Sequence, residues 1–281
     1  MDRRNHTMAA EEQSMRTEPR VLVIAGSDSS GGAGIARDVA VLTGLGVHAS
    51  IAITAVTAQT HERVAAVGPM TPALVSAQME AALEAGPVGA IKIGMLATRG
   101  TVEAVAAVLR KHDRIPVVLD PVLVSSSGGR LLERDAVAAL KLDLLPLCRL
   151  VTPNWPELAA LTDQEPARNE KEALAQGDLL LASGCGALLV KGGHAPDGEK
   201  SVDILLGRGH VPVRFEAPRL DVSMRGTGCA LASSIAGGVA RGLPLEDSIV
   251  FGKQNVYHIL DAASRTHHQQ GDLTHKRAPQ A

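Results

Sequence analysis

The alternation of short apolar runs with longer stretches of helical pattern constrains the fold of this chain more than any other feature. Apolar runs rich in β-branched residues predict strands at 21–25, 48–59, 90–96, 116–124, from 150, and at 187–194. Helices are expected at about 34–45, 71–85, 98–112 and 244–263. Strands that are separated by helices run parallel, with helices on both faces of the sheet. We therefore predict an α/β fold with one mostly parallel central sheet.

One internal segment and both ends depart from this alternation. Residues 201–221 contain two extended runs on either side of Gly207–Arg208–Gly209, which predicts a short antiparallel hairpin. Residues 1–19 and 266–281 are polar and are expected to be tails, the first of them disordered. No internal repeat or linker divides the chain between them, so we predict a single domain at 20–265.

The composition argues against several classes of function. The chain has one Trp, one Tyr and two Phe and a net charge of −2, so we expect no nucleic-acid surface built on stacking and positive charge. No apolar run is long enough to span a membrane, and residues 1–19 lack the apolar core of a secretory signal. Cys148, Cys185 and Cys229 form neither a disulfide framework nor a zinc spacing, which indicates a reducing compartment.

Glycines and polar residues follow the first two predicted strands. The glycine-rich loop 26–34 is neither a Walker A motif nor G-x-G-x-x-G, and its glycines are expected to let the backbone approach a small ligand. Asp38 comes one helical turn later and is expected to point back toward the loop, with an exposed helix residue as the alternative. Gln59 ends the second strand, and its amide can both donate to and accept from a heteroaromatic ring, or else cap a loop.

The later strand ends supply an apolar side chain, a carboxylate and an ammonium group. Met95 could press against a flat ligand, although a core methionine is the more common outcome. Asp120 closes an apolar strand, and Lys191 lies where it could meet a phosphate. Because ligands of parallel sheets bind at the carboxyl ends of the strands, we expect the functional site at this edge.

Asn154 and Glu157 flank a predicted helix start and have two interpretations. Asn at the cap, Pro156 early in the helix and Glu in the first turn form an ordinary capping pattern. Glu157 could instead reach a magnesium ion or its water. The residues alone leave both interpretations open.

The segment Arg225–Gly226–Thr227–Gly228–Cys229 precedes a run of small and apolar residues that predicts a buried helix. Its glycines allow N–H groups at the helix start to converge on one point, where the helix dipole adds positive charge. Such a place suits a phosphate or the charge that develops when one is transferred. A thiol in this first turn is expected to have a lowered pKa, so that a Cys229 thiolate could accept a proton. The alternative is a tight turn into a core helix.

These residues together resemble the ribokinase-like superfamily, and within it the hydroxymethylpyrimidine/phosphomethylpyrimidine kinases of thiamine synthesis. The matching motifs lie, in order, at 25–35, 54–59, 92–96, 119–122, 152–157, 191–194 and 226–229. The similarity extends from about Val21 to Asp261. It implies a ribokinase-like fold, an aminopyrimidine substrate, ATP with Mg²⁺, and a homodimer. From the composition and the cysteines we expect a cytoplasmic location and no nucleic-acid or membrane partner.

The resemblance also implies roles for residues around the substrate. Asp38 and Gln59 match positions that hydrogen-bond the aminopyrimidine. Gly26 lies beside the ligand, and Met95 and Val122 match apolar positions around its ring.

Other roles concern the phosphates. Lys191, Asn154, Glu157 and Arg225 are assigned to the nucleotide by this resemblance, and Asp120 and Glu157 to magnesium. The turn formed by Gly226, Thr227 and Gly228 matches the anion hole, and Cys229 takes the place of a catalytic base. Arg225 stands where relatives often have His, and it could add charge for a second phosphate or narrow the choice of substrate.

Three functions follow as hypotheses. The favoured one is an ATP- and Mg²⁺-dependent kinase of hydroxymethylpyrimidine, of its monophosphate, or of both. The second is a pyridoxal-type vitamin B6 kinase, which also acts on a small substituted heteroaromatic ring. The third is a regulator that binds a pyrimidine without catalysis, although such a protein has no need for the phosphate-side residues.

Overall fold

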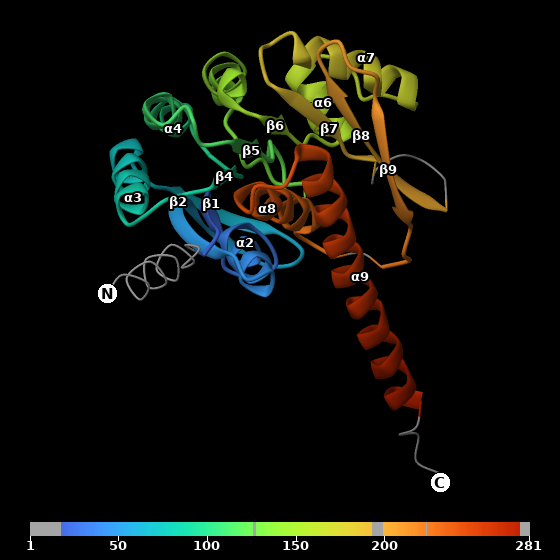
Figure 1. Ribbon diagram of the computed structural model, residues 1–281. Coiled ribbons are helices and arrows are strands. Elements are labelled where there is room, and N and C mark those ends of the chain that lie inside the picture. Colours follow the sequence, from blue (N-terminus) through green and yellow to red (C-terminus); the bar gives the residue numbers. More distant parts are fainter. Residues whose placement is uncertain (1–17, 126–127, 193–198, 223, 276–281) are drawn as a thin grey trace, which may run out of the picture.

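The computed structural model describes residues 18–125, 128–192, 199–222 and 224–275. In these ranges a sheet of nine strands is covered by helices on both faces (Figure 1). The strands are β1 (Arg20–Asp28), β2 (His48–Gln59), β3 (Val64–Pro69), β4 (Ala90–Ile93), β5 (Val117–Leu119), β6 (Leu150–Val151), β7 (Ala187–Val190), β8 (Lys200–Gly207) and β9 (Val213–Pro218). The helices are α2 (Gly34–Gly44), α3 (Pro72–Glu84), α4 (Arg99–Lys111), α5 (Arg134–Ala139), α6 (Trp155–Thr162), α7 (Glu170–Leu181), α8 (Thr227–Ala240) and α9 (Leu245–His275). A π-helical turn at Leu140–Leu144 and a 3-10 turn at Leu145–Leu147 follow α5.

The parallel strands occupy the centre of the sheet. The strand order is β3-β2-β1-β4-β5-β6-β7-β8-β9. Neighbours from β2 to β7 pair in parallel, whereas β3, β8 and β9 pair antiparallel with their neighbours. The predicted mostly parallel α/β sheet is therefore confirmed, and β8 with β9 is the predicted hairpin.

The strands contribute side chains to an apolar core on each face of the sheet. On one face Leu22 and Ile24 belong to a buried cluster with side chains of α3, α4, α6 and α7. On the other face Val21 and Val23 pack with side chains of α2, α8 and α9 (Figure 1). Consecutive side chains of a strand point to opposite faces, so β1 must be apolar along nearly its whole length. This double burial explains the continuous apolar runs in the sequence.

Several elements differ from their predicted extents. β4 ends at Ile93 and β5 ends at Leu119, earlier than predicted. The residues that follow each strand are no longer paired as strands and lie at the carboxyl end of the sheet. The edge strand β3 was not predicted, since its sequence of small residues lacks a clear apolar alternation.

The chain ends also differ in part from expectation. α9 continues to His275, beyond the predicted end near 263 and into the predicted polar tail. The predicted N-terminal tail lies outside the described residues up to residue 17. Among the helices of the described ranges, none combines the length and the apolar character needed to cross a membrane.

The contact between α8 and α9 requires a glycine. A Cβ added at Gly252 would lie 2.8 Å from Cγ1 of Ile235 and 3.3 Å from the backbone of Ile235 and Leu231. An alanine there gains about 1 kcal/mol of helix propensity, but the overlap with a packed helix costs about 1–3 kcal/mol. We expect Gly252→Ala to lower the free energy of unfolding in urea.

Gly44 provides a matched control for this substitution. It also lies in a helix, but a Cβ added there meets no heavy atom within 4 Å. Gly44→Ala should raise the free energy of unfolding by up to about 1 kcal/mol. Equal effects of the two alanines would contradict the close approach of α8 and α9.

Candidate active site

The carboxyl ends of the parallel strands meet along one edge of the sheet. Backbone hydrogen bonds join successive ends: Gly94 N–H donates to Ile24 at 2.8 Å, Asp120 N–H to Ile93 at 2.8 Å, Thr152 N–H to Leu119 at 2.9 Å and Lys191 N–H to Pro153 at 2.9 Å. This continuous ladder brings residues from distant parts of the sequence to one edge. The edge was predicted as the site because parallel strands present all of their carboxyl ends together.

The amino end of α8 lies against this edge. Gly226 caps the helix with φ of 75°, and a Cβ there would come within 2.4 Å of the Gly32 carbonyl oxygen. A Cβ added at Gly228 would lie 3.3 Å from Nζ of Lys191 and 3.5 Å from Oδ2 of Asp120. Glycines at these positions therefore let the first turn of the helix approach both the glycine-rich loop and a buried ion pair. The predicted turn into a buried helix is confirmed, since Ala230 to Val239 are all buried.

One lysine and two carboxylates that the sequence assigned to the nucleotide or to magnesium form a single cluster. Lys191 Nζ donates to Oδ1 of Asp120 at 2.7 Å and lies 3.6 Å from Oε2 of Glu157. Burial disfavours the charged ammonium, but the two carboxylates outweigh it and raise the pKa of Lys191. Burial raises the pKa of Glu157, while Lys191 opposes that rise. The cluster carries one positive and two negative groups when all are ionised.

Asn154 and Glu157 form a capping box at the start of α6. The Glu157 N–H donates to Oδ1 of Asn154 and the Asn154 N–H donates to Oε2 of Glu157, both at 2.8 Å. The capping interpretation is therefore confirmed. The same Oε2 also faces Lys191, so the cap holds the carboxylate at the edge of the sheet.

Three of the predicted substrate residues form an apolar wall. A Cβ added at Gly26 would lie 2.8 Å from the sulfur of Met95. Met95 is buried in a small cluster with Ala55 and Leu131, and Val122 packs against that cluster. Gln59 lies farther along the same edge, where its Oε1 accepts from the Thr57 hydroxyl at 3.2 Å.

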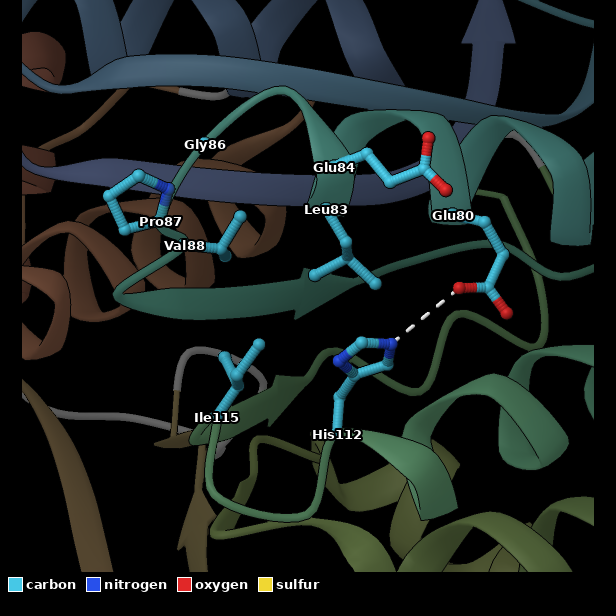
Figure 2. Close-up of a pocket in the computed structure, with 8 residues that line it drawn as sticks. All are labelled: Glu80, Leu83, Glu84, Gly86, Pro87, Val88, His112 and Ile115. Atoms are coloured by element: carbon cyan, nitrogen blue, oxygen red, sulfur yellow. Dashed lines mark ion pairs between the residues drawn. The ribbon is translucent and has the colours of Figure 1, made fainter.

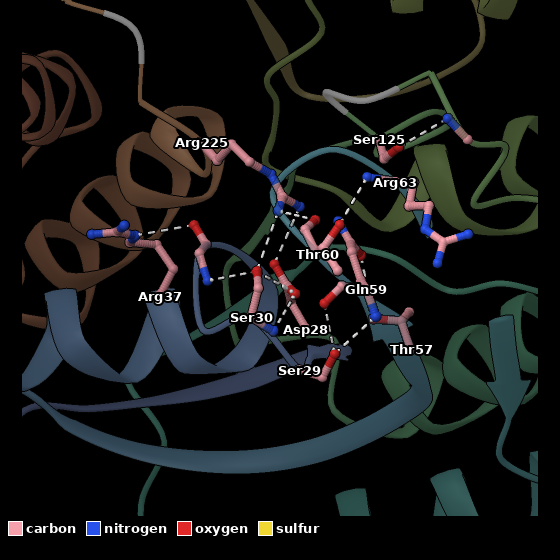
Figure 3. A network of polar contacts seen from close by, with 12 residues as sticks. Asp28, Ser29, Ser30, Arg37, Thr57, Gln59, Thr60, Arg63, Ser125 and Arg225 are labelled. Atoms are coloured by element: carbon pink, nitrogen blue, oxygen red, sulfur yellow. Dashed lines mark hydrogen bonds and ion pairs between the residues drawn. The ribbon is translucent and has the colours of Figure 1, made fainter. Parts of the chain in front are cut away.

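Arg225 connects segments that are far apart in the sequence (Figure 3). Its Nη1 donates to the Thr60 carbonyl at 2.7 Å and to the Ser30 hydroxyl at 3.2 Å. Its Nη2 lies 3.3 Å from Oδ2 of Asp28, at the end of β1. The structure thus places Arg225 at the ends of β1 and β2, whereas Lys191 follows β7 on the other side of the edge.

Asp38 is fully buried, so the alternative of an exposed helix residue is wrong. Its Oδ2 accepts from the ammonium of Lys92 at 2.7 Å, and its Oδ1 accepts from the Ser233 hydroxyl at 2.8 Å. Burial raises the pKa of Asp38, and the charge of Lys92 opposes the rise. Both carboxylate oxygens thus face protein groups that join α2, β4 and α8.

Lys92 was missed as a functional candidate. It is a fully buried lysine in the middle of an apolar strand. Lysine is almost never fully buried unless it is paired, so a lysine inside such a run was the available signal. The sequence did not show which carboxylate is its partner.

The expected lowering of the Cys229 pKa is wrong. The side chain is half-buried, and burial raises the pKa of the thiol to about 11. The charge of Lys92 and a hydrogen bond from the Gly34 N–H oppose this rise without reversing it, and Asp38 and Asp120 add to it. Cys229 is therefore a thiol at neutral pH.

A groove elsewhere on the molecule contains none of the predicted residues. It is lined by Glu80, Leu83, Glu84, Gly86, Pro87, Val88, His112 and Ile115 (Figure 2). These residues precede β4 and β5, at the end of the sheet opposite the strand ends described above. Glu80 is already paired with Lys111 at 2.8 Å and with His112 at 3.6 Å.

The buried pair of Asp38 and Lys92 leads to a stability prediction. Asp38→Asn keeps the shape but leaves the Lys92 ammonium without a counter-charge, and breaking a buried pair in this way costs about 3–5 kcal/mol. We expect a loss of this size in urea denaturation, with recovery of most of it in the double variant Asp38→Asn/Lys92→Met.

The exposed pair of Glu80 and Lys111 is the control. Glu80→Gln removes a charge from a solvent-exposed pair, and such pairs contribute little to stability. A loss from Asp38→Asn as small as that from Glu80→Gln would show that the buried pair does not support the fold.

The chain has clear relatives. A family model described as phosphomethylpyrimidine kinase matches residues 28–274. The hydroxymethylpyrimidine/phosphomethylpyrimidine kinase of Rhizobium meliloti (strain 1021) is 43% identical over 251 residues, which cover 89% of this chain and 93% of the relative.

Solved structures agree with this match. A phosphomethylpyrimidine kinase from Clostridium difficile 630 has a TM-score of 0.75 and 32% identity, covering 85% of this chain and 98% of the other. The pyridoxal kinase from Staphylococcus aureus in complex with pyridoxal has a TM-score of 0.79 and 27% identity, covering 87% and 88%. The fold is therefore ribokinase-like, and the chain belongs to the phosphomethylpyrimidine kinase family.

Proposed function

We propose that this chain is a phosphotransferase that uses ATP to phosphorylate hydroxymethylpyrimidine, its monophosphate, or both, in thiamine biosynthesis. The family match and the relatives named above support this function. The observation that carries it is the position of α8, whose amino end lies between the glycine-rich loop and the ion pair of Lys191 and Asp120. A phosphate placed there would meet a helix dipole and an ammonium group from two sides.

Positioning and electrostatic stabilisation carry most of the catalysis in this proposal, as in other phosphoryl transfers. In this proposal the N–H groups at Gly226, Thr227 and Gly228 form the anion hole, and Lys191 and Asp120 both lie next to Gly228. Asn154 and Glu157 would line the nucleotide side next to Lys191. These groups are fixed by glycine contacts, a capping box and ion pairs before any ligand binds.

Asp120 and Glu157 fit a magnesium ion that is shared with phosphate. Their carboxylates both face Lys191, but no group of three or more His, Cys, Asp or Glu side chains within the described ranges could hold a metal alone. Mg²⁺ usually takes one or two carboxylates together with substrate phosphates and water. When bound, the ion would neutralise charge on the phosphates being transferred.

Glu157→Gln tests this assignment without disrupting the helix cap. Glutamine also serves at the third position of a capping box, and Lys191 keeps its bond to Asp120, so the free energy of unfolding should fall by less than in Asp38→Asn. Loss of the negative charge should raise the Mg²⁺ concentration for half-maximal activity on the order of tenfold. The measurement is initial rate against Mg²⁺ at saturating ATP.

Glu172 is the matched control, because it follows the cap of α7 as Glu157 follows the cap of α6. The Glu172 N–H donates to Oδ1 of Asn169 at 3.0 Å. The exposed Glu172 carboxylate accepts from the Arg168 N–H at 2.8 Å and from Asn169 Nδ2 at 3.0 Å. Glu172→Gln should leave the Mg²⁺ dependence unchanged. The same Mg²⁺ dependence in both variants would exclude Glu157 from the metal site.

On the substrate side, we propose that Gln59 contacts the polar edge of the ring and that Gly26, Met95 and Val122 contact its faces. The grouping of Gly26, Met95 and Val122 supports this assignment. For Asp38 we propose an indirect role, because both of its oxygens already accept hydrogen bonds from Lys92 and Ser233. It would keep α2, β4 and α8 in register beneath the ligand.

Cys229 is proposed to take the hydroxyl proton of the free alcohol. The pKa of about 11 makes the thiolate scarce at neutral pH, and its fraction grows about tenfold per pH unit up to that value. If Cys229 is the base, the rate on the alcohol should rise between pH 7 and pH 10. The monophosphate has a second pKa of about 6 and is already a dianion above pH 7, so its rate should not rise in this way.

Cys229→Ala measures the same difference by substitution. Loss of a general base costs about 10²–10⁴ in rate, which we expect in kcat on the alcohol. On the monophosphate we expect a loss of less than about tenfold, since its nucleophile needs no base. Equal losses on the two substrates would assign Cys229 a structural role in the first turn of α8.

A pyridoxal kinase activity is the alternative function, and the match to the Staphylococcus aureus enzyme favours considering it. Turnover of hydroxymethylpyrimidine, its monophosphate and pyridoxal should be compared in parallel with the purified protein. Turnover of pyridoxal alone would replace the proposed function, and binding of a pyrimidine without turnover would favour a regulator. We also propose a homodimer in the cytoplasm, supported by the family resemblance and by three free cysteines.

A further inference from the structure

One nitrogen of the Arg225 guanidinium makes a short hydrogen bond, whereas the opposite edge of the group makes only a long contact with a carboxylate. Nη1 donates to the Thr60 carbonyl at 2.7 Å, a short bond that anchors the side chain. Nη2 lies 3.3 Å from Oδ2 of Asp28, longer than the 2.7–2.9 Å that is usual for a charged pair. Within the described part of the chain, Nε is buried and has no hydrogen-bond partner. The edge formed by Nε and Nη2 therefore has hydrogen-bond donors that Asp28 does not fully satisfy.

Asp28 is the anion that faces this edge, and its position is fixed from the other side. Its Oδ1 accepts from the N–H of Ser30 at 2.9 Å and from the Ser30 hydroxyl at 2.8 Å. Only Oδ2 faces the guanidinium, and the carboxylate is nearly buried. A bidentate pair, in which both oxygens meet both donors of an arginine edge, is therefore not formed. Figure 3 shows Asp28 and Ser30 below the Arg225 side chain.

The guanidinium group of Arg225 lies on the substrate side of the site. It directly precedes Gly226, the cap of α8, so it lies beside the anion hole. Asp28 ends β1, and β4, β5 and β6 separate β1 from β7, which precedes Lys191. The charged groups are closer than these strands, because the Lys191 ammonium pairs with Asp120 directly after β5. β5 is two strand spacings from β1, roughly 10 Å, which places the two cations on different phosphate groups.

We propose that Arg225 is a specificity-determining residue that binds the phosphate of the monophosphate substrate, with Asp28 as the anion that this phosphate displaces. The inference rests on the proposed function and adds to it the group that distinguishes the two pyrimidine substrates. A phosphate dianion would pair with Nε and Nη2 together, while Nη1 keeps its anchor on Thr60. The free alcohol has no such charge and leaves the contact with Asp28 intact.

Two substitutions that should change the Kd of the monophosphate in opposite directions test this assignment. Arg225→Gln removes the charge, and we expect the Kd of the monophosphate to rise about 10–100-fold, as for loss of a charged hydrogen bond. Asp28→Asn removes the competing anion, and we expect the same Kd to fall by about 2–10-fold. Neither variant should change the Kd of the alcohol by more than about threefold. Binding is measured by calorimetry in the absence of ATP.

The alternative is that Arg225 and Asp28 only hold the loops together. Breaking their contact from either side would then weaken binding of both substrates in both variants, and that result would overturn the proposal. Arg110→Gln is the control for loss of an arginine, because Arg110 pairs with Asp143 on the surface, and it should change neither Kd.

Kinetics separate this proposal from the proposed function. The native enzyme is assayed with ATP on the alcohol and on the monophosphate. If the native enzyme phosphorylates neither the alcohol nor the monophosphate, the proposed function is rejected. If the native enzyme is active but Arg225→Gln and Asp28→Asn change the Kd of the monophosphate in the same direction, only the role of Arg225 is rejected. Selective loss of kcat/KM on the monophosphate in Arg225→Gln would support both.

Discussion

The ion pair between Asp38 and Lys92 is the interaction on which the rest of the site depends. Two charges with no exposed surface are expensive to bury, and the cost is offset only by close mutual contact and further hydrogen bonds. Ser233 supplies such a bond at 2.8 Å. The three residues belong to α2, β4 and α8. α2 follows the glycine-rich loop, β4 leads to Met95, and α8 begins at the proposed anion hole. A core held only by apolar contacts would tolerate small shifts between these elements, whereas a buried pair with directional bonds does not.

The strand order then separates the chemistry of the site into two halves. Residues at the carboxyl ends of β1 and β2 and after β4 form the side around Gly26, Gln59 and Met95. Residues after β5, β6 and β7 form the side around Lys191. One helix end serves both halves, because Gly226 lies against the glycine-rich loop and Gly228 lies against Lys191 and Asp120. Side chains larger than hydrogen would push α8 away from either half. The glycines thus set the distance across which a phosphoryl group can be transferred.

Most of the parallel sheet follows from the sequence, because double burial produces apolar runs and each run ends in polar residues. The capping box at Asn154 and Glu157 was also readable, since it depends on local spacing alone. β3 was not, because an edge strand of small residues has no buried face to mark it. Long-range pairing was equally hidden: no spacing joins Asp38 to Lys92 or Arg225 to Asp28. The pKa of Cys229 was misjudged because a position in a helix turn predicts the dipole but not the burial, which dominates here.

The high pKa of this thiol bears on how one site could serve two substrates. A nucleophile that is already a phosphate dianion needs fixed positive charge, and a thiolate close to it would repel both that nucleophile and the nucleotide. A neutral thiol avoids this repulsion, whereas the proton of an attacking alcohol can be accepted only by the small fraction of Cys229 that is thiolate. Burial next to Asp38 and Asp120 keeps Cys229 neutral, while Lys92 limits how far its pKa rises. The same buried pair that fixes the geometry of α8 therefore also acts on the pKa of Cys229, which Asp38 raises and Lys92 lowers, while burial has the largest effect.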